Sequence, residues 1–280
     1  MDIKGLLREY GLHPHKGLGQ NFLVDSRVLQ RIVDTAQLEP QDLVLEIGSG
    51  LGTLTQALAE VVQRVVAVEL DEQLVQILRT RLASFTNLKI VCGDVLALDI
   101  PELMGAEGAK TSSFKVVANI PYYITSAVLR HVLEATVRPE LFVVMVQREV
   151  AQRIVAQPGQ MSLLAVSVQF YGSARVVFRV PARAFYPAPK VDSAVVRIAP
   201  YQELPLEEHE VAAFFAVVRA GFAQRRKQLR NALLHGLPVS ENQLSAATAD
   251  AGIDPCRRAQ TLSVEEWLAL YHALGVATDR

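Results

Sequence analysis

The chain has 280 residues and a formal net charge of −1 at pH 7, and half of its residues are apolar. This length predicts about two domains, each able to bury a core. No apolar run approaches the roughly 20 residues of a membrane-spanning helix, and the N-terminus lacks a signal-peptide core, so we expect a cytoplasmic protein without membrane association. Cys92, Cys256 and the His13/His15 pair lack metal-ligand spacing, which predicts that no metal is bound.

A glycine-rich turn lies in the segment DLVLEIGSGLGTLT, residues 42–55. Its apolar residues predict a buried strand, and Gly48, Gly50 and Gly52 then precede a helix. Glycine lets the backbone turn sharply towards a ligand, and the first N–H groups of the helix are free to bind it. A nicotinamide site would need G-x-G-x-x-G, but Thr53 stands at the sixth position. The G-x-G-x-G spacing is typical of S-adenosylmethionine sites.

Acidic side chains follow the next two predicted strands. The strand at 64–68 is followed by Glu69, which can accept hydrogen bonds from both hydroxyls of a ribose. The strand at 88–91 is followed by Asp94, placed to accept a hydrogen bond from the amino group of a cofactor adenine. Each residue alone could be a strand end, a turn residue or a helix cap. In a doubly wound sheet these strand ends line one crevice, which favours a shared ligand site.

The tetrapeptide Asn119-Ile120-Pro121-Tyr122 directly follows the apolar run at 114–118. The lone pair of an adenine amino group is delocalised into the ring, so the nitrogen attacks poorly until its N–H groups are hydrogen-bonded. Asn119 Oδ1 and a backbone carbonyl near Ile120 can accept those bonds, Pro121 stiffens the turn, and Tyr122 can stack on the base. The alternative is a strand that ends in a proline turn. The three other strand ends favour methyl transfer to adenine.

The elements predicted along the chain indicate two domains. Up to residue 200 strand and helix patterns alternate, which predicts an α/β, Rossmann-like methyltransferase sheet. Later strand patterns of this domain are Leu141–Val146, Leu163–Phe170 and Ala194–Ile198. A proline-flanked linker precedes residues 206–280, where the pattern is all-helical. The helices expected there are Val211–Ala223, Arg225–His235, Asn242–Ala251 and Val264–Leu274.

Basic residues gather in the helical domain. Residues 211–240 contain no Asp or Glu but include four basic residues that we call the basic cluster: Arg225, Arg226, Lys227 and Arg230. Phosphate binding depends on local potential more than on net charge. The basic cluster therefore predicts an RNA-binding surface, with a solvated helix face as the alternative. A mobile, basic N-terminal arm that includes Lys16 is also expected.

With these motifs the chain resembles the rRNA adenine dimethyltransferase family, and within it the bacterial small-subunit dimethyladenosine transferases. The resemblance spans almost the whole chain, with Ser49 where the family commonly has Pro and Tyr123 where it commonly has Asn. The matching stretches are GLGQNFLVD (17–25), EIGSGLGTLT (46–55), VEL (68–70), GD (93–94), NIPYYIT (119–125), VQREV (146–150), FYPAPKVDSAVVRI (185–198) and RRKQLRNAL (225–233).

The resemblance implies two sets of site residues. The cofactor set comprises Asn21, Leu23, Gly48, Gly50, Glu69, Asp94 and Asn119. Within it Asn21 and Leu23 would close over the cofactor, and Gly48 would approach its methionine part. The catalytic set comprises Asn119, Ile120, Pro121, Tyr122 and Phe185, with Tyr122 and Phe185 as aromatic walls around a flipped adenine.

The implied activity is S-adenosylmethionine-dependent dimethylation of two adjacent adenosines near the 3′ end of small-subunit (16S) rRNA. The substrate would be a partly assembled 30S particle and the enzyme a monomer, with Lys16 and the helical domain selecting the target. One alternative is a large-subunit (23S) rRNA adenine methyltransferase that confers antibiotic resistance. The other is a noncatalytic assembly or transcription factor on the same fold, against which Glu69, Asp94 and Asn119 argue.

Overall fold

Three strands of the chain are apolar runs buried on both faces, as expected for the centre of a parallel sheet covered by helices: Leu43–Ile47, Phe114–Asn119 and Leu141–Gln147. The structure is a computed structural model that describes residues 3–107, 114–224 and 226–275. The chain divides into a sheet unit, Met1–Ala151 with Ser173–Pro200, and a helical unit, Gln152–Gly172 with Tyr201–Arg280. None of the described helices is long and apolar enough to cross a membrane.

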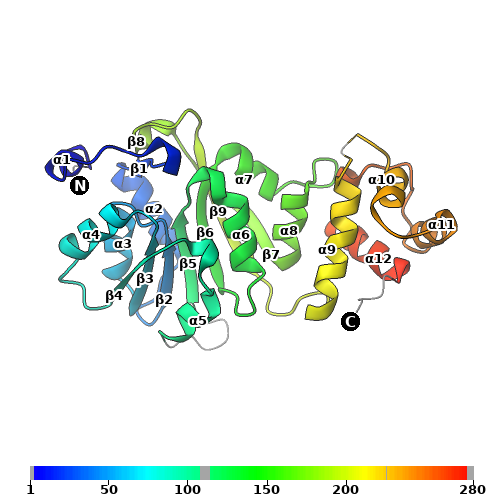
Figure 1. Cartoon of the computed structure of the whole chain (residues 1–280), viewed down its shortest axis with the longest axis horizontal. Helices are drawn as coiled ribbons and strands as arrows, with labels where there is room; N and C mark the ends of the chain where they lie inside the picture. The colour runs from blue at the N-terminus through cyan, green and yellow to red at the C-terminus, as the bar shows by residue number, and fades with distance from the viewer. Residues whose placement is uncertain (1–2, 108–113, 225, 276–280) are drawn as a thin grey trace. The chain divides into compact units, whose positions relative to one another are not determined.

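The sheet unit contains most of the strands (Figure 1). The strands are β1 (Phe22–Leu23), β2 (Leu43–Ile47), β3 (Arg64–Glu69), β4 (Leu88–Cys92), β5 (Phe114–Asn119), β6 (Leu141–Gln147), β7 (Gly172–Val180), β8 (Phe185–Tyr186) and β9 (Ser193–Pro200). The α-helices of this part are α1 (Ile3–Glu9), α2 (Ser26–Ala36), α3 (Thr53–Ala59), α4 (Glu72–Arg81), α5 (Ile100–Gly105), α6 (Thr125–Leu133) and α7 (Arg148–Ile154). Four short 3-10 helices are η1 (Lys16–Leu18), η2 (Val95–Ala97), η3 (Tyr122–Ile124) and η4 (Ala182–Ala184).

The large sheet has the strand order β4-β3-β2-β5-β6-β9-β7. The five neighbouring strands β4, β3, β2, β5 and β6 are parallel to one another, whereas β9 runs antiparallel to β6. Helices cover both faces of this sheet (Figure 1). The predicted α/β, Rossmann-like sheet is therefore confirmed. The strand order reverses between β2 and β5: β3 and β4 are added on one side of β2, and β5 and β6 on the other. Ligands of such sheets bind at this switch point, beyond the carboxyl ends of the strands.

The N-terminal arm is folded, so the prediction of a mobile arm is wrong. Helix α1 buries Ile3 and Leu7 in an apolar cluster that also contains Phe22 and, from α4, Leu74 and Ile77. The two α1 residues are four positions apart and share one helix face. This helix of seven residues is too short to give a strong periodic signal.

The expected strand Leu163–Phe170 is instead a helix, α8 (Leu163–Tyr171), and belongs to the helical unit. Seven of its nine residues are buried and only Ser167 and Gln169 are polar, so the spacing of apolar residues cannot separate a strand from a buried helix. The Ser162 hydroxyl caps the helix by accepting from Ala165 N. Residues 152–172 thus interrupt the sheet unit, a feature that the proposed boundary at residue 200 did not anticipate.

The helical unit packs around aromatic side chains. Its remaining helices are α9 (Glu208–Phe222), α10 (Leu229–Gly236), α11 (Glu241–Asp250), η5 (Ala259–Thr261) and α12 (Val264–Leu274). The rings of Phe170 on α8 and Phe214 on α9 stack with centroids 4.9 Å apart. Fully buried Trp267 on α12 occupies the space beside Gly221, where a Cβ atom would clash with its ring. The four helices predicted after the linker are present, each within a few residues of its expected bounds.

Candidate functional site

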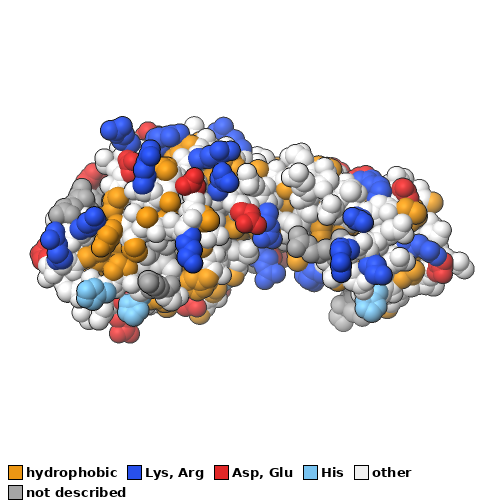
Figure 2. Space-filling model, turned by 90° about the horizontal axis from the view of Figure 1, so that it is seen from above, with side chains coloured by type: hydrophobic (Ala, Val, Ile, Leu, Met, Phe, Trp, Pro, Cys, Tyr) orange, Lys and Arg blue, Asp and Glu red, His pale blue; other side chains and the backbone are white. Residues whose placement is uncertain are grey.

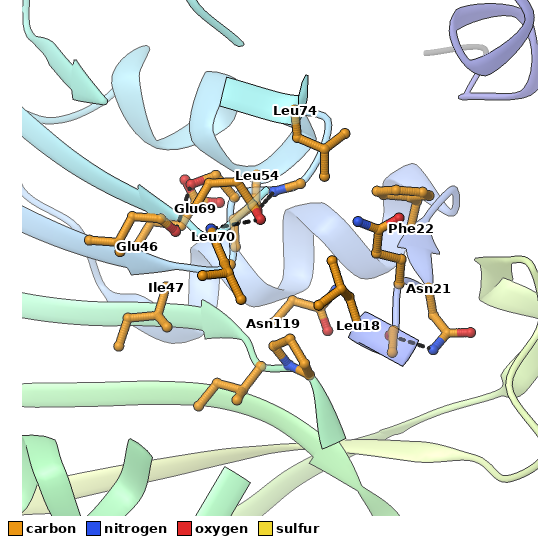
Figure 3. Close-up of a pocket in the computed structure, with 18 of the residues that line it drawn as sticks. Leu18, Asn21, Phe22, Glu46, Ile47, Leu54, Glu69, Leu70, Leu74 and Asn119 are labelled. Atoms are coloured by element: carbon orange, nitrogen blue, oxygen red, sulfur yellow. Dashed lines mark hydrogen bonds between the residues drawn. The ribbon is translucent and has the colours of Figure 1, made fainter. Parts of the chain in front are cut away.

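A pocket at the carboxyl ends of β2, β3, β4 and β5 brings the predicted site residues together (Figure 3). All seven members of the cofactor set line this pocket, as do Ile120, Pro121 and Tyr122. Glu46 and Glu69 reach it from the sheet, whereas Leu18, Asn21 and Phe22 approach from the N-terminal segment on the opposite side (Figure 3). The pocket therefore has a floor of strand ends and a wall made by residues 18–23.

The glycine turn holds the carboxylate of Glu69. Gly50 N donates to Glu69 Oε2 at 2.8 Å, and the N–H groups of Leu70 and Asp71 donate to Oε1 at 2.9 and 3.0 Å. These three bonds fix both oxygens. They use both lone pairs of Oε1 and leave one lone pair on Oε2 for a ligand hydroxyl. Burial raises the pKa of Glu69, and the three backbone N–H groups partly oppose that rise.

Gly48 lets the turn approach the end of β5 closely. Its φ of +77° lies in the left-handed region, and a Cβ atom there would lie 3.3 Å from the carbonyl oxygen of Asn119. Any other residue would be strained and would crowd the pocket at this position. Ser49, the departure from the family pattern, fits the turn because its hydroxyl donates to Val68 O at 3.4 Å.

Asp94 and Asn119 complete the polar lining. Asp94 is exposed and caps η2 by accepting from Leu96 N through Oδ1 at 3.0 Å, which leaves Oδ2 for another donor. Asn119 is the last residue of β5 and is half-buried. Within the described part of the chain, neither the Asn119 carboxamide nor the Ile120 carbonyl makes a hydrogen bond with the protein. Both acceptors are therefore available to a ligand.

Tyr122 is fixed beside these acceptors. Its hydroxyl lies 2.7 Å from Ser193 Oγ, and Ser193 is fully buried at the start of β9. Burial raises the pKa of the Tyr122 phenol, so the ring stays neutral around pH 7. Pro121 supports the turn, because its carbonyl accepts from Ile124 N at 3.2 Å. This geometry presents one oriented aromatic ring next to two free acceptors.

Phe185 does not line the pocket, in contrast to its expected role as an aromatic wall. Only 4% of Phe185 is exposed, and its side chain packs in the core with Leu23, its partner in the β1–β8 pair. The alternation of a strand sends successive side chains to opposite faces, and this register directs Phe185 inward. Phe185 therefore supports β1 from the core rather than contacting the pocket.

Glu46 is a pocket residue that the sequence interpretation missed. It lies on β2, is 1% exposed, and its Oε2 has no hydrogen-bond partner among the described residues. Burial, together with the nearby charge of Glu69, raises the pKa of Glu46 to about 8. The carboxyl is therefore protonated at neutral pH. The available signal was a charged residue inside the apolar run LVLEI, because fully buried acids are rare.

The N-terminal segment is held against the pocket by side-chain amides. Gln20 Nε2 donates to Asp71 Oδ2 at 2.9 Å, and Asn21 Nδ2 donates to Gly19 O at 2.9 Å. The ring of Phe22 contacts the glycine turn, since a Cβ atom at Gly50 would lie 3.3 Å from it. Leu18 and Gln20 also line the pocket; they lie in the matching stretch 17–25 but were not predicted as site residues.

The pocket fits S-adenosylmethionine in the chemistry of its donors and acceptors. Glu69, fixed by three N–H groups, would accept from a ribose hydroxyl through Oε2, and Asp94 Oδ2 would accept from the adenine amino group. Gly48 has no Cβ atom, so the methionine part could approach the backbone closely there; a Cβ atom would crowd this position. Among the described residues no group of three or more His, Cys, Asp or Glu is arranged to hold a metal ion.

The described members of the basic cluster lie around the start of α10. Arg226, Lys227 and Arg230 are exposed, and Arg230 forms an ion pair with Glu241. Arg225 and the side chain of Lys16 lie outside the described part of the structure. Leu229 N donates to Arg257 O at 2.7 Å, which brings exposed Arg258 next to α10. Lys and Arg side chains are frequent on the face of the helical unit that Figure 2 shows.

The strand order, the glycine turn and the free acceptors after β5 define the protein as a Rossmann-like methyltransferase. Residues 11–274 match the family described as "Ribosomal RNA adenine dimethylase". The chain belongs to this family. This assignment confirms the resemblance that the sequence motifs indicated.

Curated relatives cover nearly the full chain. "Ribosomal RNA small subunit methyltransferase A" of Dehalococcoides mccartyi is 48% identical over 95% of this chain and 90% of the relative. The protein of the same name from Bacillus mycoides is 41% identical over 97% of this chain and 94% of the relative.

Two solved structures are similar over the whole fold. The 23S rRNA methyltransferase ErmE is 32% identical, with a TM-score of 0.72, over 91% of this chain and 100% of that chain. A dimethyladenosine transferase from Plasmodium falciparum is 23% identical, with a TM-score of 0.77, over 92% of this chain and 99% of that chain, and shows a likeness of fold.

Proposed function

We propose that the chain uses S-adenosylmethionine to dimethylate the 6-amino groups of two adjacent adenosines near the 3′ end of small-subunit rRNA. The observation that supports this most is the pair of unengaged acceptors, Asn119 Oδ1 and the Ile120 carbonyl, beside the ring of Tyr122. Family membership fixes the class of base and reaction. Relatives that are 41–48% identical and named for the small subunit favour that subunit over the large one.

The residues of the pocket activate a weak nucleophile. Asn119 Oδ1 accepts a hydrogen bond from one N–H of the target amino group, and the Ile120 carbonyl accepts from the other. Together they draw the nitrogen towards tetrahedral geometry, so its lone pair leaves conjugation with the ring. Tyr122, held by Ser193, stacks on the flipped adenine and keeps it in line for attack. Bound S-adenosylmethionine would supply an electrophilic methyl group on a positively charged sulfur.

The chain needs no strong base for this reaction. A protonated aryl amine is acidic enough to lose its proton to solvent after methyl transfer. Holding two reactants in attack geometry can supply about 7–11 kcal/mol of the barrier reduction. The role of the glycine turn, Glu69, Asp94 and the Asn119 turn is therefore to position both reactants.

The basic cluster is proposed to dock the RNA. Arg226 and Lys227 are exposed, whereas the ion pair with Glu241 weakens the contribution of Arg230. A nearly neutral protein with a local basic surface gains little nonspecific affinity and depends on a preformed RNA shape. We therefore propose a partly assembled 30S particle as substrate, a monomeric enzyme and a cytoplasmic location with the ribosomes.

Methyl transfer from radiolabelled S-adenosylmethionine to three substrates tests this proposal. The substrates are unmethylated small-subunit particles, protein-free large-subunit rRNA and mature methylated ribosomes. The proposal predicts incorporation of up to four methyl groups per small-subunit particle and background labelling of the other two. Labelling of large-subunit rRNA alone would move the assignment to the ErmE-like alternative. Cofactor binding without any transfer would favour a noncatalytic assembly factor.

A further inference from the structure

Tyr123 is an exposed aromatic side chain at the mouth of the pocket, and the mechanism above does not use it. It is the second residue of η3, and 58% of it is exposed, whereas the preceding Tyr122 is half-buried. Both tyrosines line the same pocket. An aromatic ring left in solvent beside a ligand site is a ready contact surface for another flat group.

One side of Tyr123 is supported by the N-terminal segment. A Cβ atom at Gly19 would lie 3.5 Å from Cδ1 and 3.7 Å from Cε1 of the tyrosine ring. Gly19 has a φ of +63° and is tied in place because its carbonyl accepts from Asn21 Nδ2 at 2.9 Å. The neighbouring Gln20 is bonded to Asp71. The ring therefore rests against a braced loop, while more than half of the residue Tyr123 stays exposed.

We propose that Tyr123 is a second base-binding position, which stacks on the adenosine next to the one held by Tyr122. This inference rests on the proposed function, in which the two target adenosines are adjacent. Extruding one base from a stack leaves its neighbour without a stacking partner. Consecutive residues lie about 3.8 Å apart along the backbone, so consecutive tyrosines can hold consecutive nucleotides. Stacking of a base on an aromatic side chain corresponds to about a 5- to 150-fold effect on binding.

A purely structural role for Tyr123 has a different consequence. If the ring only braced Gly19, its loss would loosen residues 18–21 and weaken cofactor binding, whatever base stood next to the target. If the ring stacks on RNA, its loss lowers methyl transfer, leaves cofactor affinity unchanged, and depends on the neighbouring base. The two roles therefore differ in two separate readouts.

The test uses the full-length enzyme with Tyr123→Ala and, as the matched control that keeps the ring, Tyr123→Phe. Small-subunit particles are reconstituted with rRNA that carries either both adjacent adenosines or an abasic nucleotide in place of one of them. We expect Tyr123→Ala to lower kcat/KM for the first methyl transfer about 5- to 150-fold on the intact pair. On the abasic particle, wild type and Tyr123→Ala should agree within about twofold. Tyr123→Phe should follow wild type on both particles.

Several results would overturn the inference. It fails if Tyr123→Ala matches wild type on the intact pair, or is impaired equally on both particles. It also fails if calorimetry shows that S-adenosylmethionine binds Tyr123→Ala more weakly by the same factor. A wild-type enzyme that methylates neither particle refutes the proposed function instead, and removes the basis of the inference with it.

Discussion

The buried carboxyl of Glu46 should make the stability of the ligand-free sheet unit depend on pH, and Glu46→Gln should remove this contribution. The pKa of Glu46 is raised from 4.5 to about 8 in the folded protein. Between these values the folded state keeps a proton that the unfolded state releases, so the free energy of unfolding falls as pH rises through this window. At about 1.4 kcal/mol per pH unit, the fall is on the order of 5 kcal/mol by pH 8 and then levels off.

The assay compares wild type and Glu46→Gln in urea at pH 5, 7 and 9. Because the chain has two units, unfolding is followed by pulsed hydrogen exchange at peptides from β2, which report the sheet unit alone. Relative to wild type, Glu46→Gln should gain several kcal/mol of stability between pH 5 and pH 9. Glu60→Gln, a substitution at an exposed carboxylate on the end of α3, is the control and should track wild type. Parallel pH curves for wild type and Glu46→Gln would refute the protonated, buried state of Glu46.

Asn119→Ala should lower the single-turnover methyl-transfer rate about 100- to 1000-fold, as expected for loss of a preorganised polar group, and should weaken cofactor binding far less. A rate within threefold of wild type would exclude the proposed role. Glu69→Ala should weaken S-adenosylmethionine about 10- to 100-fold in equilibrium dialysis, whereas Glu72→Ala, an exposed neighbour on α4, should not, and equal affinities would remove Glu69 from the site. Replacing Arg226 and Lys227 with Ala should flatten the salt dependence of particle binding by up to about 0.7–0.9 in the log–log slope per lost contact. Arg230→Ala should change that slope less, because Arg230 is already paired with Glu241. Identical slopes for the double variant and wild type would mean that the basic cluster is only a solvated helix face.

Much of the sheet unit could be predicted because its signals are local. Strands β2, β3 and β5 are short apolar runs, and the polar residues that follow them, Glu69 and Asn119, lie on the same edge once the strands are parallel. The glycine turn could be predicted from its glycines, because Gly48 and Gly50 both adopt the positive φ that glycine tolerates best. Strand ends thus predict a shared pocket without any knowledge of distant contacts.

The parts that could not be predicted depend on distant contacts. Residues 18–23 join the pocket through a two-residue strand that pairs with β8 far along the chain, and the same pairing turns Phe185 into the core. The α8 segment is almost entirely buried and has no exposed polar face, so its spacing of apolar residues does not distinguish it from a strand; its packing against α9 in the helical unit does. Arg230 stood in a stretch free of acids, yet Glu241 from the next helix pairs with it.

Mapping the modified positions shows whether this pocket dimethylates adjacent adenosines of small-subunit rRNA. Unmethylated small-subunit particles are incubated with S-adenosylmethionine and either wild type or Asn119→Ala, and primer extension is run across the 3′ end of the rRNA. We expect two consecutive stops with wild type, identified by mass spectrometry as dimethyladenosine, and none with Asn119→Ala in the same time. A single stop, stops elsewhere in the rRNA, or paired stops of equal strength with Asn119→Ala would contradict this expectation.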